Sequence, residues 1–294
     1  MFIILAIAGY ALLGLAALLD KFILSKKVSH PLTYVFYISV PFLLLFLAMP
    51  FGARWPASMQ SWLVALGGGL FFLAGLWLMF EGVKKSEVSH VGPLVGASVS
   101  LFTVILSRIF LGEILALNKI WGIGFLIAGS LLISFEKSKK HNGAHLGMLL
   151  GILSGLFFAA SFVASKYVYI DLGFVSGLMW TKGFLGIGGL SLLLLPLVKR
   201  EVFRKNISTV KSSRGIVLAN MCLSATGVFL IQYAVSIGSV SIVSAFEGLK
   251  YAILIILVAM ISKFFPKILK EEYTKWEMGQ EVVAIVLISI GLAL

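Results

Sequence analysis

Charged side chains are scarce in this sequence. Asp, Glu, Lys and Arg together make up 12% of its 294 residues, whereas soluble domains are about a quarter charged. Hydrophobic residues account for 60%, and the mean hydropathy is +1.06. One soluble core could not bury so much apolar surface. The composition therefore excludes an ordinary soluble domain and predicts an integral membrane protein.

Cysteine and the short motifs of common enzymes are also missing. The single cysteine, Cys222, lies inside an apolar run, so it cannot form an intramolecular disulfide or build a metal site alone. The patterns H-E-x-x-H, C-x-x-C, G-x-x-x-x-G-K-[ST] and G-x-S-x-G do not occur. We therefore expect neither an enzyme nor an ATP-driven pump, and we expect no metal or cofactor.

Acidic residues are half as numerous as basic ones, 12 against 24, which gives a formal charge of +12. The basic residues form short clusters between apolar runs rather than a stripe or an aromatic platform, so we do not expect nucleic-acid binding. Seventeen of them fall in loops on one side of the membrane, and only Arg54, Arg108 and Lys119 fall on the other. The positive-inside rule then predicts cytoplasmic basic loops, with both termini outside, in the cell (inner or plasma) membrane.

Apolar runs long enough to cross about 30 Å of hydrocarbon recur along the whole chain. The first run begins at Phe2 without a basic segment before it, so it is interpreted as a membrane span rather than a cleavable signal peptide. The breaks between runs are short and rich in Gly, Pro, Asn and Asp. The sequence predicts an all-α protein with ten transmembrane helices, at about 2–24, 32–49, 60–80, 88–111, 118–135, 146–170, 174–197, 214–236, 240–262 and 277–294.

The two halves of the chain resemble each other. The sixteen residues from Gly9 align with those from Ser154, which matches Lys21 with Lys166. The stretch that begins at Val88 aligns with the one that begins at Val240. Because five spans is an odd number, the second half must enter the membrane from the opposite side. We therefore predict two inverted five-helix repeats, residues 1–140 and 141–294.

Several of these segments contain short motifs: Asp20-Lys21, Val88-Ser89, Pro93, Ser107-Arg108 and Leu111-Gly112-Glu113. In these motifs the chain resembles the EamA-type ten-helix transporters of the drug/metabolite transporter superfamily. It implies a substrate cavity between the halves, lined mainly by the third, fourth, eighth and ninth spans, and alternating access without ATP hydrolysis. The second half lacks the Gly-Glu pair after its fourth span, which leaves the substrate class open.

Glu247 and Lys250 are the most unusual residues of the ninth span, because both fall near the middle of the bilayer. A charge there costs at least about 2.5–3.5 kcal/mol, so neither should face lipid. Spaced i,i+3, they share a helix face. They form either an intrahelical structural pair or a cavity site that binds substrate or carries a coupling proton on Glu247.

Three further lysines lie within spans: Lys182, about eight residues into the seventh span, and Lys21 and Lys166, near helix ends. The latter two can also reach the membrane interface with their long side chains. If several of these lysines line the cavity, they outnumber Glu247. The sequence then favours an anionic or zwitterionic substrate, such as an amino-acid-like compound or a sugar phosphate.

Pro93 is expected to interrupt the fourth span opposite the Glu247 region, because proline removes a backbone donor. Paired broken or polar segments in two halves are typical of a midplane binding site. Gln232 of the eighth span is a candidate hydrogen-bonding residue of the same site, although a hydrogen bond between helices is its more ordinary role.

The predicted function is secondary transport of a small polar metabolite, with a proton or counter-metabolite as the driving solute. Two other functions remain open: an anion-conducting channel, and a flippase for a lipid-linked sugar or phosphate. The expected partners are the small-molecule substrate and membrane lipid, and the chain is expected to be a monomer or homodimer.

Overall fold

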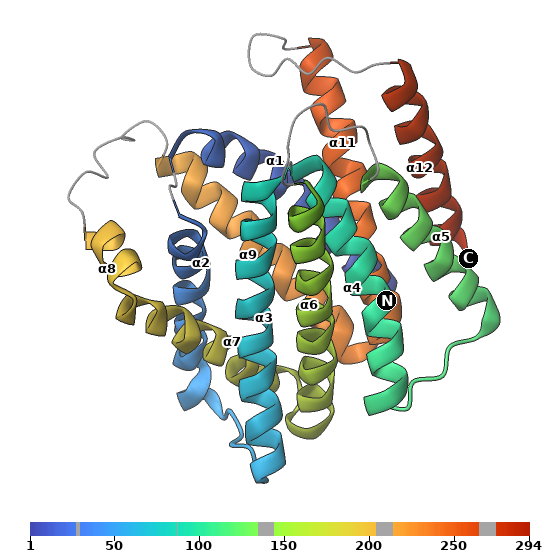
Figure 1. Ribbon diagram of the computed structural model, residues 1–294. Helices are drawn as coiled ribbons and strands as arrows, with labels where there is room; N and C mark the ends of the chain where they lie inside the picture. Colours follow the sequence, from blue (N-terminus) through green and yellow to red (C-terminus); the bar gives the residue numbers. More distant parts are fainter. Residues whose placement is uncertain (28–29, 87, 135–143, 204–213, 265–274) are drawn as a thin grey trace.

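The protein is described by a computed structural model that covers residues 1–27, 30–86, 88–134, 144–203, 214–264 and 275–294. All regular structure in these residues is helical (Figure 1). The elements are α1 (Phe2–Lys27), α2 (Pro31–Ser39), η1 (Val40–Phe51), α3 (Met59–Lys85), α4 (Val88–Phe110), α5 (Leu117–Ser134), α6 (Ala144–Leu172), α7 (Phe174–Ser191), η2 (Leu192–Leu194), α8 (Pro196–Phe203), α9 (Arg214–Ile237), α10 (Val240–Ala245), α11 (Glu247–Phe264) and α12 (Lys275–Ala293).

Nine segments of this part of the chain are long and apolar enough to cross a membrane. They correspond to the first nine predicted spans. A shorter apolar helix, Gly279–Ala293, lies where the tenth was expected. The chain is therefore a multi-pass membrane protein.

Two of the nine segments are not uniform α-helices. The second changes from α2 to the tighter 3-10 helix η1, near Pro41, whose ring nitrogen cannot donate to the preceding turn. The ninth consists of α10 and α11, with Phe246 between them. By contrast, α4 runs without interruption through Pro93. The expectation that Pro93 breaks the fourth span is therefore wrong, because one missing donor leaves the other helical bonds of α4 in place.

Small residues at seven-residue intervals join α3 to α6. A seven-residue spacing returns to the same side of a helix, so each helix presents one small surface to the other. Ser154 Oγ donates to Gly75 O at 2.8 Å, and Ser161 Oγ donates to Gly68 O at 2.7 Å. The contacting pairs are Gly68 with Ser161, Gly75 with Ser154, and Gly82 with Gly147. The two helices are thus antiparallel and pack closely over three contact levels.

Two other helix pairs pack through glycine in the same way. A Cβ added at Gly9 of α1 would lie 2.9 Å from Gly227 O of α9, and one added at Gly227 would lie 2.9 Å from Gly9 O. Gly122 of α5 and Gly291 of α12 approach each other equally closely. Close backbone approach through small residues is the usual way in which membrane helices associate. These close contacts through small residues are called glycine seams below. They hold together the helices that carry the polar side chains of the candidate site.

Candidate functional site

The break in the ninth span places Glu247 at the start of a helix. Ser239 caps α10 by accepting a hydrogen bond from Ile242 N, and α10 ends after only six residues. Phe246 has φ −72° and ψ 0°, and α11 begins at the next residue, Glu247. The positive end of a helix dipole stabilises a carboxylate in the first turn. The local fold therefore places the Glu247 carboxylate at the positive end of α11, inside the membrane.

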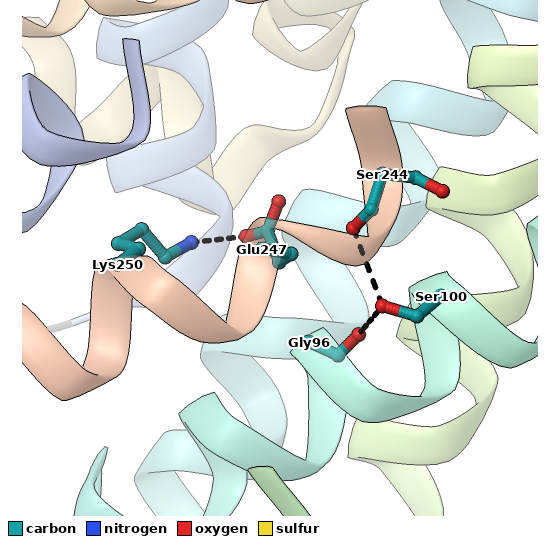
Figure 2. Close-up of polar contacts among 5 residues, drawn as sticks. All are labelled: Gly96, Ser100, Ser244, Glu247 and Lys250. Carbon is teal, nitrogen blue, oxygen red and sulfur yellow. Dashed lines mark hydrogen bonds and ion pairs between the residues drawn. The ribbon is translucent and has the colours of Figure 1, made fainter. Parts of the chain in front are cut away.

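Ser100 of α4 holds the broken segment against the first half of the chain. Its Oγ lies 2.9 Å from Gly96 O and 3.2 Å from Ser244 O, so its proton can bond either carbonyl. Figure 2 shows this contact beside the turn between α10 and α11. A carbonyl at a helix end needs such a partner in a membrane, where water is absent. Ser100 therefore joins α4 to the site.

Lys250 forms an ion pair with Glu247 one turn further along α11 (Figure 2). The two side chains are only 15% and 12% exposed, respectively. Lys250 Nζ also lies 4.6 Å from the centre of the Tyr251 ring. The predicted i,i+3 pairing is therefore present, and the two charges largely neutralise each other.

Close packing surrounds this pair. Tyr10 of α1 is fully buried, and its hydroxyl lies near the Glu247 carboxylate without meeting the geometry of a hydrogen bond. A Cβ at Gly92 would lie 2.5 Å from Tyr251 Cε1, and one at Gly96 would lie 3.3 Å from Glu247 Cγ. The two glycines that flank Pro93 therefore let α4 approach α11. The region of Pro93 does meet Glu247, as the sequence suggested.

Lys182 of α7 has different surroundings from Lys250. Its side chain is 1% exposed, and its Nζ finds no hydrogen-bond partner among the described residues. The ammonium lies 4.0 Å from the centre of the Phe72 ring of α3, which is a favourable cation–π distance. The face of an aromatic ring thus lies against this buried cation.

Gln232 belongs to a polar group in α6, α7 and α9. Tyr169 donates to Gln232 Oε1 at 2.7 Å, and the hydroxyls of Ser165 and Thr181 are within interaction range of the Tyr169 hydroxyl. Ser165 Oγ is buried without a hydrogen-bond partner, whereas Thr181 donates to Gly177 O at 2.7 Å. Since Thr181 precedes Lys182, this group lies on the same turn of α7 as the unpaired cation.

Lys166 is bonded to backbone carbonyls. Its Nζ donates to Val235 O and Ser236 O at 3.0 Å each and to Gly238 O at 2.8 Å. These carbonyls lie at the C-terminal end of α9, where the last four carbonyls of a helix lack intrahelical partners. Lys166 therefore caps α9. The side chain of Lys21, its counterpart in the first half, lies outside the described residues.

The sequence did not single out several residues that the fold brings to these places: Tyr10, Phe72, Ser100, Ser165 and Tyr169. The hydroxyls of Tyr10, inside the first apolar span, and Tyr169, near the end of the sixth, were the available signal, because a buried hydroxyl usually has a hydrogen-bond partner. No group of three or more His, Cys, Asp or Glu that could hold a metal occurs in the described part of the chain.

Comparison with known proteins supports the membrane fold. No curated protein matches the sequence. One solved crystal structure covers 99% of this chain and 95% of its own, with a TM-score of 0.68 and 16% identity, a likeness that concerns the fold alone. Residues 1–135 match the EamA-like transporter family. This match over just under half of the chain supports an EamA-type membrane transporter of the drug/metabolite transporter superfamily.

Proposed function

We propose that the protein is a secondary transporter for a small polar metabolite that carries an anionic group, alone or as part of a zwitterion. The observation that carries this proposal is Lys182, a cation buried within a membrane span without a hydrogen-bond partner. Intramembrane cations normally pair with a counter-charge or mark a substrate pathway. A carboxylate or phosphate on the substrate would supply the missing partner.

Two other lysines within the spans give less support to an anionic substrate than Lys182 does, because they have partners inside the protein. Lys250 is neutralised by Glu247, and Lys166 is occupied by three carbonyls. The excess of intramembrane positive charge that the sequence indicated therefore reduces, among the side chains described, to Lys182. Gln232, Tyr169 and Ser165 lie near the same turn of α7 and offer hydrogen bonds to the rest of a polar solute.

Glu247 and Lys250 are proposed as the coupling pair. A proton bound by Glu247 would release Lys250, and an anionic counter-metabolite could compete with Glu247 for the same ammonium. In either case the loss of the ion pair would act on the neighbouring turn between α10 and α11. If a proton drives transport, Glu247→Gln should remove the pH dependence of flux in proteoliposomes. Unchanged pH dependence would exclude Glu247 as the proton carrier.

Transport by alternating access would follow from two inverted repeats, residues 1–140 and 141–294, with α12 as the tenth span. The glycine seams support this arrangement. The shift of 145 residues that aligns Lys21 with Lys166 carries Gly9 onto Ser154, and the shift of 152 that aligns Val88 with Val240 carries Gly75 onto Gly227. Since Gly75 contacts Ser154 and Gly227 contacts Gly9, the two seams are equivalent under the repeat.

The proposed orientation has cytoplasmic basic loops and both termini outside the cell (inner or plasma) membrane. Contacts between the segments assigned to the outer side support their common side of the membrane. Lys119 Nζ donates to Leu294 O at 2.8 Å, and Gly238 packs against Phe2. A C-terminal tag should then be accessible from outside intact cells. Accessibility from the cytoplasm alone would reverse the orientation.

A ligand screen tests the proposed substrate class. Purified protein is heated in detergent with amino acids, sugar phosphates, nucleotides, other organic anions and organic cations, since a bound ligand raises the unfolding temperature. We expect shifts from anionic or zwitterionic compounds, and shifts from cations alone would refute the proposal. Saturable flux with counter-transport in vesicles would then support a carrier, whereas single-channel conductance would indicate an anion channel.

A further inference from the structure

The two halves pack differently around α7 and η1. α3 contacts α7 along its length and also contacts α2. Its second-half counterpart under the proposed repeat is α9, yet no described residue of α9 comes within 8 Å, Cα to Cα, of α2 or η1. α9 touches only α7 in this region, through aromatic contacts of Phe174 with Phe229 at 5.3 Å and with Tyr233 at 5.0 Å. A space therefore remains between η1 and α9 that has no equivalent beside α3.

This space is a groove of about 340 Å³. Its floor is formed by buried residues of α7, and its edges include Val175 and Phe229, which are 60% and 48% exposed. All of the residues belong to membrane-spanning segments. The lining consists of Leu45 and Ala48 from η1, Phe174, Val175, Leu178 and Met179 from α7, and Phe229 and Tyr233 from α9.

We propose that this groove binds one acyl chain of a membrane phospholipid. Apolar side chains exposed within a membrane span face lipid hydrocarbon, so the edges of the groove open onto acyl chains. Water is a poor occupant because the lining offers almost no hydrogen-bonding groups, and an apolar cavity of about 150 Å³ already binds benzene-sized molecules. An empty groove would also deprive its lining of dispersion contacts. The abundant ligand that fits is an acyl chain.

A bound chain would occupy the space that α9 must enter in order to reach η1. Under the repeat, the counterpart of the α3–α7 contact is a contact between α9 and the second span. The lipid would therefore stabilise the present arrangement, in which α3 contacts α7. It would oppose the alternate arrangement, in which α9 contacts the second span. This consequence rests on the proposed alternating access, whereas the binding itself requires only the membrane location.

The binding is tested with a phospholipid that carries a photoreactive group on its acyl chain, in nanodiscs, with labelled peptides mapped by mass spectrometry. Labelling should concentrate on residues 174–179 and 229–233. Ala48→Trp fills the groove from η1 and should lower this labelling about tenfold, the change that corresponds to roughly 1.4 kcal/mol of lost contact. Leu47→Trp is the matched control, because Leu47 is adjacent in η1, 68% exposed and not part of the lining.

Labelling of the groove peptides no stronger than that of the exposed α12 residues Val282 and Val283 would overturn the proposal. Equal labelling in Ala48→Trp and Leu47→Trp would overturn it as well. If Ala48→Trp does not elute as a monodisperse protein, Val175→Trp at the edge of the groove replaces it and should give the same loss. The experiment uses no transported solute, so its failure would leave the proposed substrate class untouched.

Discussion

Lys250 and Lys182 are both lysines buried within membrane spans, but the fold treats them differently. Lys250 has a carboxylate one turn away, at the N-terminus of α11, and an aromatic ring beside it. Lys182 has the ring of Phe72 and no hydrogen-bond partner in the described structure. Removing one partner of a buried ion pair lowers stability strongly, because the remaining buried charge has no partner. The difference suggests that Lys250 is held in place by the protein and that Lys182 is kept for a ligand.

The largest expected effect comes from breaking the ion pair. Glu247→Gln leaves Lys250 buried without a counter-charge, so we expect the free energy of unfolding to fall by about 3–5 kcal/mol. The double variant Glu247→Gln/Lys250→Met removes both charges and should recover most of that loss. Unfolding by a denaturing detergent in mixed micelles measures both. A double variant as unstable as Glu247→Gln would contradict the pairing.

Lys166 gives the comparison a third member, a lysine satisfied by carbonyls. Lys166→Met removes three hydrogen bonds from the end of α9, each made by a charged donor. We expect a loss of about 2–3 kcal/mol in the free energy of unfolding, since a hydrogen bond to a charged group contributes about 1.5–3 kcal/mol and this site is only half-buried. Lys119→Met, which removes one exposed bond to Leu294 O, is the control. Equal effects of the two variants would refute the capping role.

Lys182→Met should have the opposite sign. An unpaired cation near the middle of a span costs about 2.5–3.5 kcal/mol. The cation–π contact with the Phe72 ring offsets about 2 kcal/mol of this cost. Replacing the ammonium with a neutral side chain of similar length should therefore raise the free energy of unfolding by about 1 kcal/mol. Substrate-dependent flux should be lost at the same time. A stability loss like that of Glu247→Gln would mean that Lys182 has an internal partner.

The smallest expected loss of stability concerns the contact that joins the ion-pair region to α4. Ser100→Ala removes a hydroxyl that bonds carbonyls of α4 and α10, so the free energy of unfolding should fall by about 1 kcal/mol. Ser289→Ala, which removes only a bond to the preceding turn of α12, should change it little. The thermal unfolding of the two variants is measured side by side. Equal stability of Ser100→Ala and Ser289→Ala would show that Ser100 does not stabilise the break between α10 and α11.

The sequence predicted the ion pair because the spacing of Glu247 and Lys250 is a local property of one helix. It failed at Pro93 for a related reason: a single proline can be accommodated within a helix, so α4 continues. The actual break, before Glu247, is accompanied by a local serine bond. Ser244 Oγ donates to Ser241 O at 3.0 Å, and such serine bonds compete with the helical backbone.

The environments of Lys166 and Lys182 could not be predicted in the same way. Lys166 reaches carbonyls about seventy positions away in the chain, and Phe72 is more than a hundred positions from Lys182. Hydropathy gives the depth of a lysine in the membrane, but its partner depends on which helices pack together. The Gly and Ser residues that bring α3 and α6 together are visible in the sequence, but their pairing along the seam is not.

The most direct test of the account is ligand binding to three proteins in parallel: the unmodified chain, Lys182→Met and Lys182→Arg. The unfolding temperature of each is measured in detergent against the same series of anionic, zwitterionic and cationic solutes. We expect an anionic or zwitterionic solute to stabilise the unmodified chain, to lose its effect with Lys182→Met, and to retain part of it with Lys182→Arg. An undiminished shift with Lys182→Met would contradict the assignment of Lys182 as the residue that binds the substrate.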